Sequence, residues 1–227
     1  MKKSFSIGDL FRAAWNDYKQ NWGILILIGI IFALVGMLGK MGHGFHGASI
    51  IGLLGWLLQM YLSLGFIRLL LNIVDGKPRK IEDIFHGAKS ISHFVYFLVV
   101  ALLYGAMVGL GMVLLVIPGL VALVGFMFAQ YLIAEEGEGI FESFKKSWEL
   151  TAGNRWKIFW LFIVVLFFNL FGLIALVIGL AITIPVTYLV WARLYRTLGT
   201  GVAESAPAEN VMIYEETIIV ETTDDAE

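Results

Sequence analysis

The chain has 227 residues, 59% of them hydrophobic and 15% charged, and its mean hydropathy is +0.83. Soluble domains are roughly 45–50% apolar and about 25% charged, so this composition predicts an integral membrane protein. The absence of cysteine excludes disulfides, thiolate nucleophiles and cysteine-ligated metals, and the net charge of −2 conceals an acidic C-terminal end and a net positive remainder.

Long apolar runs follow one another along the chain. They cover residues 22–38, 50–74, 94–116, 120–134 and 156–198. Because a helix needs roughly 17–25 apolar residues to cross a bilayer, the last run must make two passes. Ile117-Pro118-Gly119 marks a break between the third and fourth runs, since proline disfavours helix in the residue before it. We therefore predict an all-α integral membrane fold with six transmembrane helices arranged as three hairpins.

The basic residues indicate the orientation of these spans. Fifteen of the sixteen lysines and arginines precede span one, follow span six, or lie by the connections after spans two and four. Lys40 alone falls on the other side. The positive-inside rule then puts both termini in the cytoplasm. Residues 1–20 are charged and contain no short apolar core, so we expect no cleaved signal peptide.

Residues 139–156 have the pattern of an amphipathic helix. At 100° per residue, Ile140, Phe144 and Trp148 fall on one face, whereas the charged residues fall on the opposite face. Aromatic residues on one side, lysines at the rim and an apolar continuation are typical of a helix that lies in the membrane interface. We expect this helix to lead into the fifth span.

Two weaker copies of this segment precede the other span pairs. We predict a pseudo-threefold repeat of one cytoplasmic interfacial helix and one hairpin, with bounds of about 1–75, 76–137 and 138–199. The middle copy departs, because Lys89 stands where the others have tryptophan. Convergence is the alternative, since helices entering a membrane tend to carry aromatic residues. The predicted membrane-interface anchors are Phe11, Trp15, Trp22, Phe85, Phe144, Trp148 and Trp156.

Polar residues within the apolar runs are the candidates for a solute pathway. Gln59, Tyr104 and Asn169 are predicted to lie deep in the membrane, where they line a polar cavity or, alternatively, form interhelical hydrogen bonds. Three arginines, Arg68, Arg193 and Arg196, lie near cytoplasmic helix ends. We expect them to anchor the protein by reaching the lipid phosphates.

Catalytic and metal-binding patterns are absent from the sequence. We find no zinc-binding His-Glu-x-x-His helix, no phosphate-binding loop and no nucleophile elbow. His43 and His46 in the loop after the first span raise a metal hypothesis, but glycines surround them and a flexible connector is the better interpretation. No catalytic, cofactor-binding or metal-binding residue is therefore predicted, and the chain is not expected to be an enzyme.

Residues 200–227 differ from the rest of the chain. They hold eight acidic residues and no basic one. This composition predicts a disordered cytoplasmic tail attached to a membrane domain of residues 1–199. Two β-prone segments, 211–214 and 217–220, offer an alternative, in which the tail adds a strand to the sheet of a soluble partner.

Three motifs together resemble a known group of proteins. They are Leu10-Phe11-Arg-Ala-Ala-Trp15, Val116-Ile-Pro-Gly-Leu120, and Phe144-Lys-Lys-Ser-Trp-Glu-Leu-Thr151 before Trp156. Over residues 5–198 the chain is similar to uncharacterised prokaryotic membrane proteins, including the membrane domain fused to some glycerophosphodiester phosphodiesterases. The resemblance implies a prokaryotic cytoplasmic (inner) membrane location. It implies no site residue, because the phosphodiesterase chemistry resides in a separate soluble domain.

We expect a non-enzymatic membrane protein of the membrane-organisation or partner-recruitment type. Its basic, aromatic cytoplasmic side predicts binding to the bilayer and to anionic lipid head groups, and no nucleic-acid partner is expected. The alternative is a transporter or channel that passes a small solute through a cavity near Gln59 and Asn169.

Overall fold

The computed structural model describes residues 5–41, 50–77, 81–85, 87–137, 139–174 and 176–205. No strand occurs within these ranges, so the all-α prediction is confirmed for the described part. The elements are α1 (Ile7–Met41), α2 (Ile50–Val74), the 3₁₀ helix η1 (Ile81–Ile84), α3 (Ile91–Leu114), α4 (Val116–Gly125), α5 (Ala129–Glu136), α6 (Ile140–Thr151), α7 (Arg155–Ile174) and α8 (Leu176–Ser205).

Five segments are long and apolar enough to cross a membrane, as expected for a multi-pass membrane protein. They are Ile7–Met37, Gly52–Val74, Ile91–Leu114, Val116–Glu136 and Arg155–Ile174. The segment predicted as the sixth span lies in α8 and is not among the five found in the described residues. Arg193 and Arg196 lower the hydropathy of the described part of this helix.

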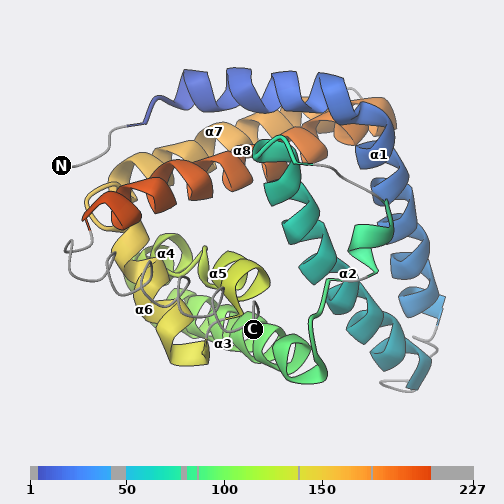
Figure 1. Cartoon of the computed structure of the whole chain (residues 1–227), viewed down its shortest axis with the longest axis horizontal. Coiled ribbons are helices and arrows are strands. Elements are labelled where there is room, and N and C mark those ends of the chain that lie inside the picture. The colour runs from blue at the N-terminus through green and yellow to red at the C-terminus, as the bar shows by residue number, and fades with distance from the viewer. Residues whose placement is uncertain are drawn as a thin grey trace, which may run out of the picture.

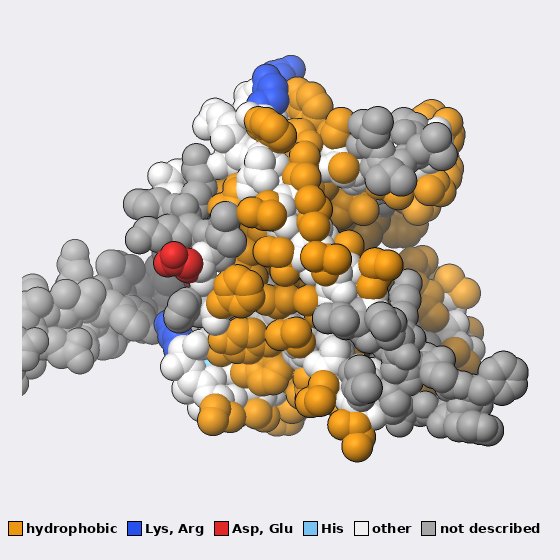
Figure 2. Space-filling model, turned by 90° about the vertical axis from the view of Figure 1, so that its right-hand side faces the viewer, with side chains coloured by type: hydrophobic (Ala, Val, Ile, Leu, Met, Phe, Trp, Pro, Cys, Tyr) orange, Lys and Arg blue, Asp and Glu red, His pale blue; other side chains and the backbone are white. Residues whose placement is uncertain are grey.

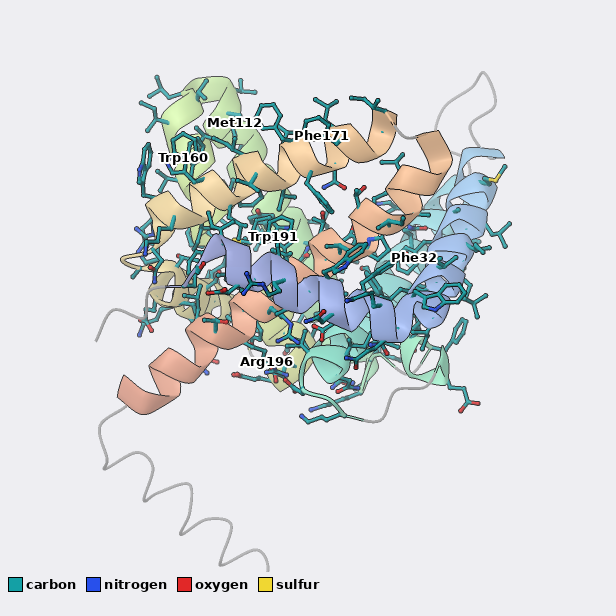
Figure 3. All side chains as sticks on the ribbon, turned by 90° about the horizontal axis from the view of Figure 1, so that it is seen from above. Phe32, Met112, Trp160, Phe171, Trp191 and Arg196 are labelled. Carbon is teal, nitrogen blue, oxygen red and sulfur yellow. The ribbon has the colours of Figure 1, made fainter. Side chains whose placement is uncertain are left out.

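The long helices pack as neighbouring pairs: α1 with α2, α3 with α4, and α7 with α8. Figure 1 shows α1 along the top and down the right, α2 on the right, α3 to α6 at the lower left, and α7 and α8 across the upper part. In Figure 3, Met112 of α3 and Phe171 of α7 lie toward one side of the molecule, and Arg196 of α8 lies toward the other. We call the Arg196 side the charged side.

Helix α1 contains both the first predicted interfacial segment and the first predicted span. It is continuous from Ile7 to Met41, and it bends so that one arm lies along α8 and the other descends beside α2 (Figure 1). Leu10, Ala14 and Asp17 on the first arm are buried. The interface segment and the span are therefore two arms of one helix.

The fourth apolar run contains two short helices. Helix α3 ends at Leu114, and Pro118 lies in the first turn of α4, where the missing N–H of proline costs no helical hydrogen bond. A side-chain carbon added to Gly111 would lie 2.8 Å from the Cα of Gly119, so the two helices meet backbone to backbone. The predicted break at Pro118 lies near the observed one, but a second break at residues 126–128 separates α4 from α5.

Helix α6 covers this second break with its small polar residues. Ser147 is fully buried, and its hydroxyl accepts a hydrogen bond from Phe128 N (3.1 Å) and donates one to Gly125 O (3.0 Å). Both backbone groups lie where α4 ends and α5 begins, and would otherwise lack helical partners. Two aromatic side chains of α6 are exposed beside this buried ridge, Phe141 at 86% and Trp148 at 37%.

The Ser147 bridge predicts a measurable loss of stability on truncation. Ser147→Ala leaves a buried N–H and a buried carbonyl without this hydroxyl, which costs about 1–3 kcal/mol of unfolding free energy. Ser143→Ala is the matched control, since Ser143 is equally buried on α6 but donates to Gly139 O, one turn away. Thermal unfolding of both variants in detergent tests this, and equal losses would contradict it.

Within the described residues 81–85 and 87–90, where the second amphipathic helix is predicted, the structure has a 3₁₀ helix and no α-helix. In its place η1 has four residues and packs on α2, where a side-chain carbon on Gly65 would lie 2.1 Å from Ile84 O. The hydroxyl of Tyr61 on α2 also donates to Phe85 O at 2.6 Å. This part of the repeat prediction is not confirmed, and close backbone contact holds the connection against the flank of α2. The threefold repeat itself is not established by these elements.

Candidate functional site

Two arginines on α8 join that helix to three others on the charged side. Arg193 pairs with Asp17 of α1 through two bonds, Nε to Oδ2 at 2.5 Å and Nη2 to Oδ1 at 2.6 Å. Arg196 Nη2 donates to Asp75 Oδ2 at 2.8 Å, just after α2, and Arg196 Nη1 donates to Glu135 of α5. The planar guanidinium fits such two-point contacts with carboxylates. These ion pairs fix the first arm of α1 and the C-terminal ends of α2 and α5 relative to α8.

A second polar cluster caps the end of α5. Arg68 Nε of α2 donates to Ala134 O at 2.6 Å, and Arg68 Nη1 donates to Gly87 O at 2.9 Å. His93 Nδ1 accepts from Lys89 N at 3.2 Å, so its other ring nitrogen, 2.7 Å from Ile133 O, carries the proton and donates. Two carbonyls near the C-terminal end of α5 thus receive side-chain donors, and Ile133 O also accepts from Gly137 N at 3.0 Å.

These contacts correct the role predicted for two of the arginines. The side chains of Arg193 and Arg196 are 28% and 26% exposed, and their guanidinium groups meet carboxylates, so the prediction that they anchor to lipid phosphates is wrong. The acidic partners were missed, since they lie 61 to 176 residues away in the chain. The available signal was the presence of three acids, Asp17, Asp75 and Glu135, at the ends of apolar segments.

An exposed face of α1 carries alternating basic and aromatic residues. We call Arg12, Trp15, Lys19 and Trp22 the α1 stripe, because their spacing puts them within about 80° on one helix face. Trp15 is 42% exposed and Trp22 is 60% exposed, whereas Asp17 on the opposite face is buried against α8. Two of the predicted anchors therefore lie on an outward surface beside cationic side chains.

Three other predicted anchors, outside the α1 stripe and α6, differ in exposure. Trp156 at the start of α7 is 70% exposed and Phe85 after η1 is 49% exposed. Phe11 packs edge-on against Phe168, with ring centroids 5.3 Å apart. Trp156 and Phe85 therefore point outward, whereas Phe11 joins α1 to α7.

Helix α6 contributes two further predicted anchors, both in contact with the α4–α5 break. Phe144 packs edge-on against Phe126, with ring centroids 5.4 Å apart. Trp148 covers Gly125, and the guanidinium of Arg155 lies 3.4 Å from its ring centroid. Phe144 and Trp148 therefore make packing contacts within the protein, in addition to their predicted role as membrane anchors.

The predicted cavity residues belong to different helix pairs. Tyr104 of α3 donates to Leu123 O of α4 at 2.9 Å, and Asn169 Nδ2 of α7 donates to Thr187 Oγ1 of α8 at 2.8 Å. Gln59 of α2 has a buried Oε1 that no hydrogen bond reaches within the described residues. A polar pathway through these three residues stays a prediction.

Pockets lie elsewhere on the molecule. A pocket of about 260 Å³ lies between the second arm of α1 and the first half of α8. A second pocket, of about 220 Å³, lies among α5, α6 and α8, near Glu136 and Tyr195. Within the described residues no group of three histidine, aspartate or glutamate side chains is arranged to hold a metal ion. His43 and His46 lie outside the described residues, as does the tail beyond Ser205.

Comparisons with known proteins place the chain among proteins without assigned activities. Residues 48–220 match the family described as "Domain of unknown function (DUF7847)". The chain is 26% identical over 230 residues to uncharacterized proteins Mb2590 of Mycobacterium bovis and Rv2560 of Mycobacterium tuberculosis, covering 87% of this chain and 70% of each relative. No solved structure matches the chain significantly.

Proposed function

The chain belongs to the DUF7847 family, whose function is unknown, and we propose that it is a non-enzymatic, multi-pass protein of the prokaryotic cytoplasmic membrane that organises lipid at the inner leaflet. The observation that carries this proposal is the α1 stripe. Its tryptophans and cations face outward, while the opposite face of the same helix is held to α8 by Asp17 and Arg193. Such a face suits the boundary between acyl chains and anionic head groups.

The proposed topology has six spans, with α8 as the sixth and both termini in the cytoplasm. The charged side, where Arg196 lies, would then face the cytoplasm, in keeping with the positive-inside rule (Figure 3). Three hairpins would point away from it, as an ancestral threefold repeat would require. Relationship to the membrane domain of glycerophosphodiester phosphodiesterases is part of the same proposal and rests on the sequence motifs.

Recruitment of a soluble partner is assigned to the acidic tail, residues 200–227. The tail has two β-prone segments among eight acidic side chains, so it could add a short strand to the sheet of a partner with a basic surface. The proposal separates two tasks, with lipid contact made by α1 and protein contact made by the tail.

Binding of anionic lipid should be strong, salt-sensitive and dependent on the α1 stripe. Removing two charges with Arg12→Gln and Lys19→Gln should weaken binding of phosphatidylglycerol in mixed micelles roughly 30-fold, at about 1 kcal/mol for each cation near the surface. Native mass spectrometry of the purified protein measures this. Lys19→Arg preserves the charge and should bind as the parent does. Indifference of the parent protein to lipid charge would refute the proposal.

A transporter is the second candidate, and the buried, unpartnered Oε1 of Gln59 favours it. A polar atom left without a bond inside an apolar region is costly and suits a site that a solute or water fills. Tyr104 and Asn169 already have bonds to neighbouring helices, so this candidate rests on Gln59 alone. Solute flux in reconstituted vesicles that disappears in Gln59→Leu would favour the transporter over the organising role.

A further inference from the structure

The α1 stripe continues into the membrane-spanning arm of the same helix. Ile26, Gly29 and Ala33 follow Trp22 at spacings of four, seven and eleven residues, which keeps them on one helix face with it. Figure 2 shows a broad hydrophobic surface on the side of the molecule where this arm descends, with charged side chains confined to its edges. The face therefore changes from cationic and aromatic to wholly apolar along one helix.

An open groove occupies the apolar part of this face. Its walls are Leu25, Ile26, Gly29, Ile30 and Ala33 of α1, and Leu180, Ala181, Ile184 and Pro185 of α8. A carbon added to Gly29 would meet nothing within 4 Å, so the glycine leaves space that no neighbouring side chain fills. The volume is about 260 Å³, several times the roughly 30 Å³ that one water molecule occupies in the liquid.

Two cationic side chains precede the groove on the same face of α1, Lys19 about two turns before Ile26 and Arg12 about four turns before it. Lys19 is exposed, and Arg12 pairs with Asp9 at 3.6 Å in a contact where both side chains are more than 70% exposed, so this pairing is weak. Anionic head groups complement these cations. A second copy of the chain, bound through the same face by a twofold axis, would instead place one cationic stripe against another.

We propose that the groove between α1 and α8 holds an acyl chain of an anionic phospholipid, whose head group lies against Lys19 and Arg12. Trp22 lies between the two parts, at the level where an indole meets the boundary of head groups and chains. This inference rests on the proposed lipid-organising function, and it adds a discrete site of one lipid to a general preference for anionic membrane.

Filling the groove tests the site without touching its charges. Gly29→Leu places a side chain in the open space, and because a Cβ at this position would have no heavy atom within 4 Å, we expect the fold to be retained. Gly105→Leu is the matched control, since Gly105 of α3 is equally open and lies outside the groove. Phosphatidylglycerol is titrated into each detergent-purified variant, and the most tightly held lipid is counted by native mass spectrometry.

Gly29→Leu should raise the dissociation constant of that lipid at least about tenfold, because excluding two chain methylenes from apolar contact already has this effect. Gly105→Leu should leave it unchanged. Retention of the lipid in Gly29→Leu would overturn the groove assignment. A parent protein that is dimeric, and becomes monomeric only in Gly29→Leu without a change in lipid binding, would assign the groove to a second copy instead. The general preference for anionic lipid should persist in Gly29→Leu. A parent protein that shows no preference for anionic lipid would refute the proposed function, which is a different outcome from failure of the groove.

Discussion

Replacing Arg196 with leucine is expected to lower the unfolding free energy by about 2–4 kcal/mol, somewhat below the cost of breaking a fully buried ion pair, because about a quarter of the side chain is exposed. The arginine lies between Asp75 and Glu135, so its loss leaves two carboxylates near one another without the cation between them. Lys77 Nζ, 3.1 Å from Asp75 Oδ2, limits the loss. The midpoint of thermal unfolding in detergent should fall by about 5–15 °C.

Two further variants identify the cause of that loss. Arg196→Lys keeps the charge but cannot reach two carboxylates with a rigid planar group, so it should fall between parent and leucine variant. Adding Asp75→Asn and Glu135→Gln to Arg196→Leu removes the unpaired charges and should restore part of the stability. If this triple variant is less stable than Arg196→Leu alone, unpaired charge is not the cause.

Asp17→Ala is the second large effect expected. It leaves Arg193 partly buried without its carboxylate, at a cost of about 2–4 kcal/mol, since the Asp17 side chain is only 12% exposed. Because this pair ties the first arm of α1 to α8, hydrogen exchange of residues 7–21 should accelerate more than exchange in α3. The measurement thus reports both global stability and local release of one arm.

Asp9→Ala is the control for Asp17→Ala. Asp9 lies on the same arm and pairs with Arg12, but both side chains are more than 70% exposed, so the expected loss is about 0–1 kcal/mol. A charge exchange, Asp17→Arg with Arg193→Asp, should be more stable than either single change. Equal destabilisation by Asp9→Ala and Asp17→Ala would show that the pair with Arg193 has no special role.

The local hydrophobicity of the sequence predicted the positions of the long helices closely. The predicted run 50–74 coincides with α2, and the predicted run 94–116 differs from α3 by a few residues at each end. The long run 156–198 was correctly divided into two helices, α7 and α8. Helix α7 ends at Ile174 and α8 begins at Leu176, and Pro185 lies inside α8.

The side chains that join helices were predicted less well than the extents of the helices. In α6 the aromatic face was predicted to lie in the membrane interface, which stays a prediction, and the buried ridge of Ser143, Ser147 and Thr151 was not predicted. Hydrophobic periodicity could not show this, because those hydroxyls are buried to satisfy Gly125 O and Phe128 N at a helix break that lies about 20 residues away. Likewise Gly65 and Gly87 carry no local signal of the close contact between η1 and α2.

By itself the sequence determined that the chain is helical and membrane-like, and where its cations and tryptophans gather, because these properties depend on composition and on spacing along one helix. Only the tertiary structure decided which cations are paired, since Arg193 meets an acid 176 residues away and Arg196 meets acids from two other helices. It also decided that Lys19 stays exposed and that α1 and α8 enclose an apolar groove, because both depend on how two distant helices pack.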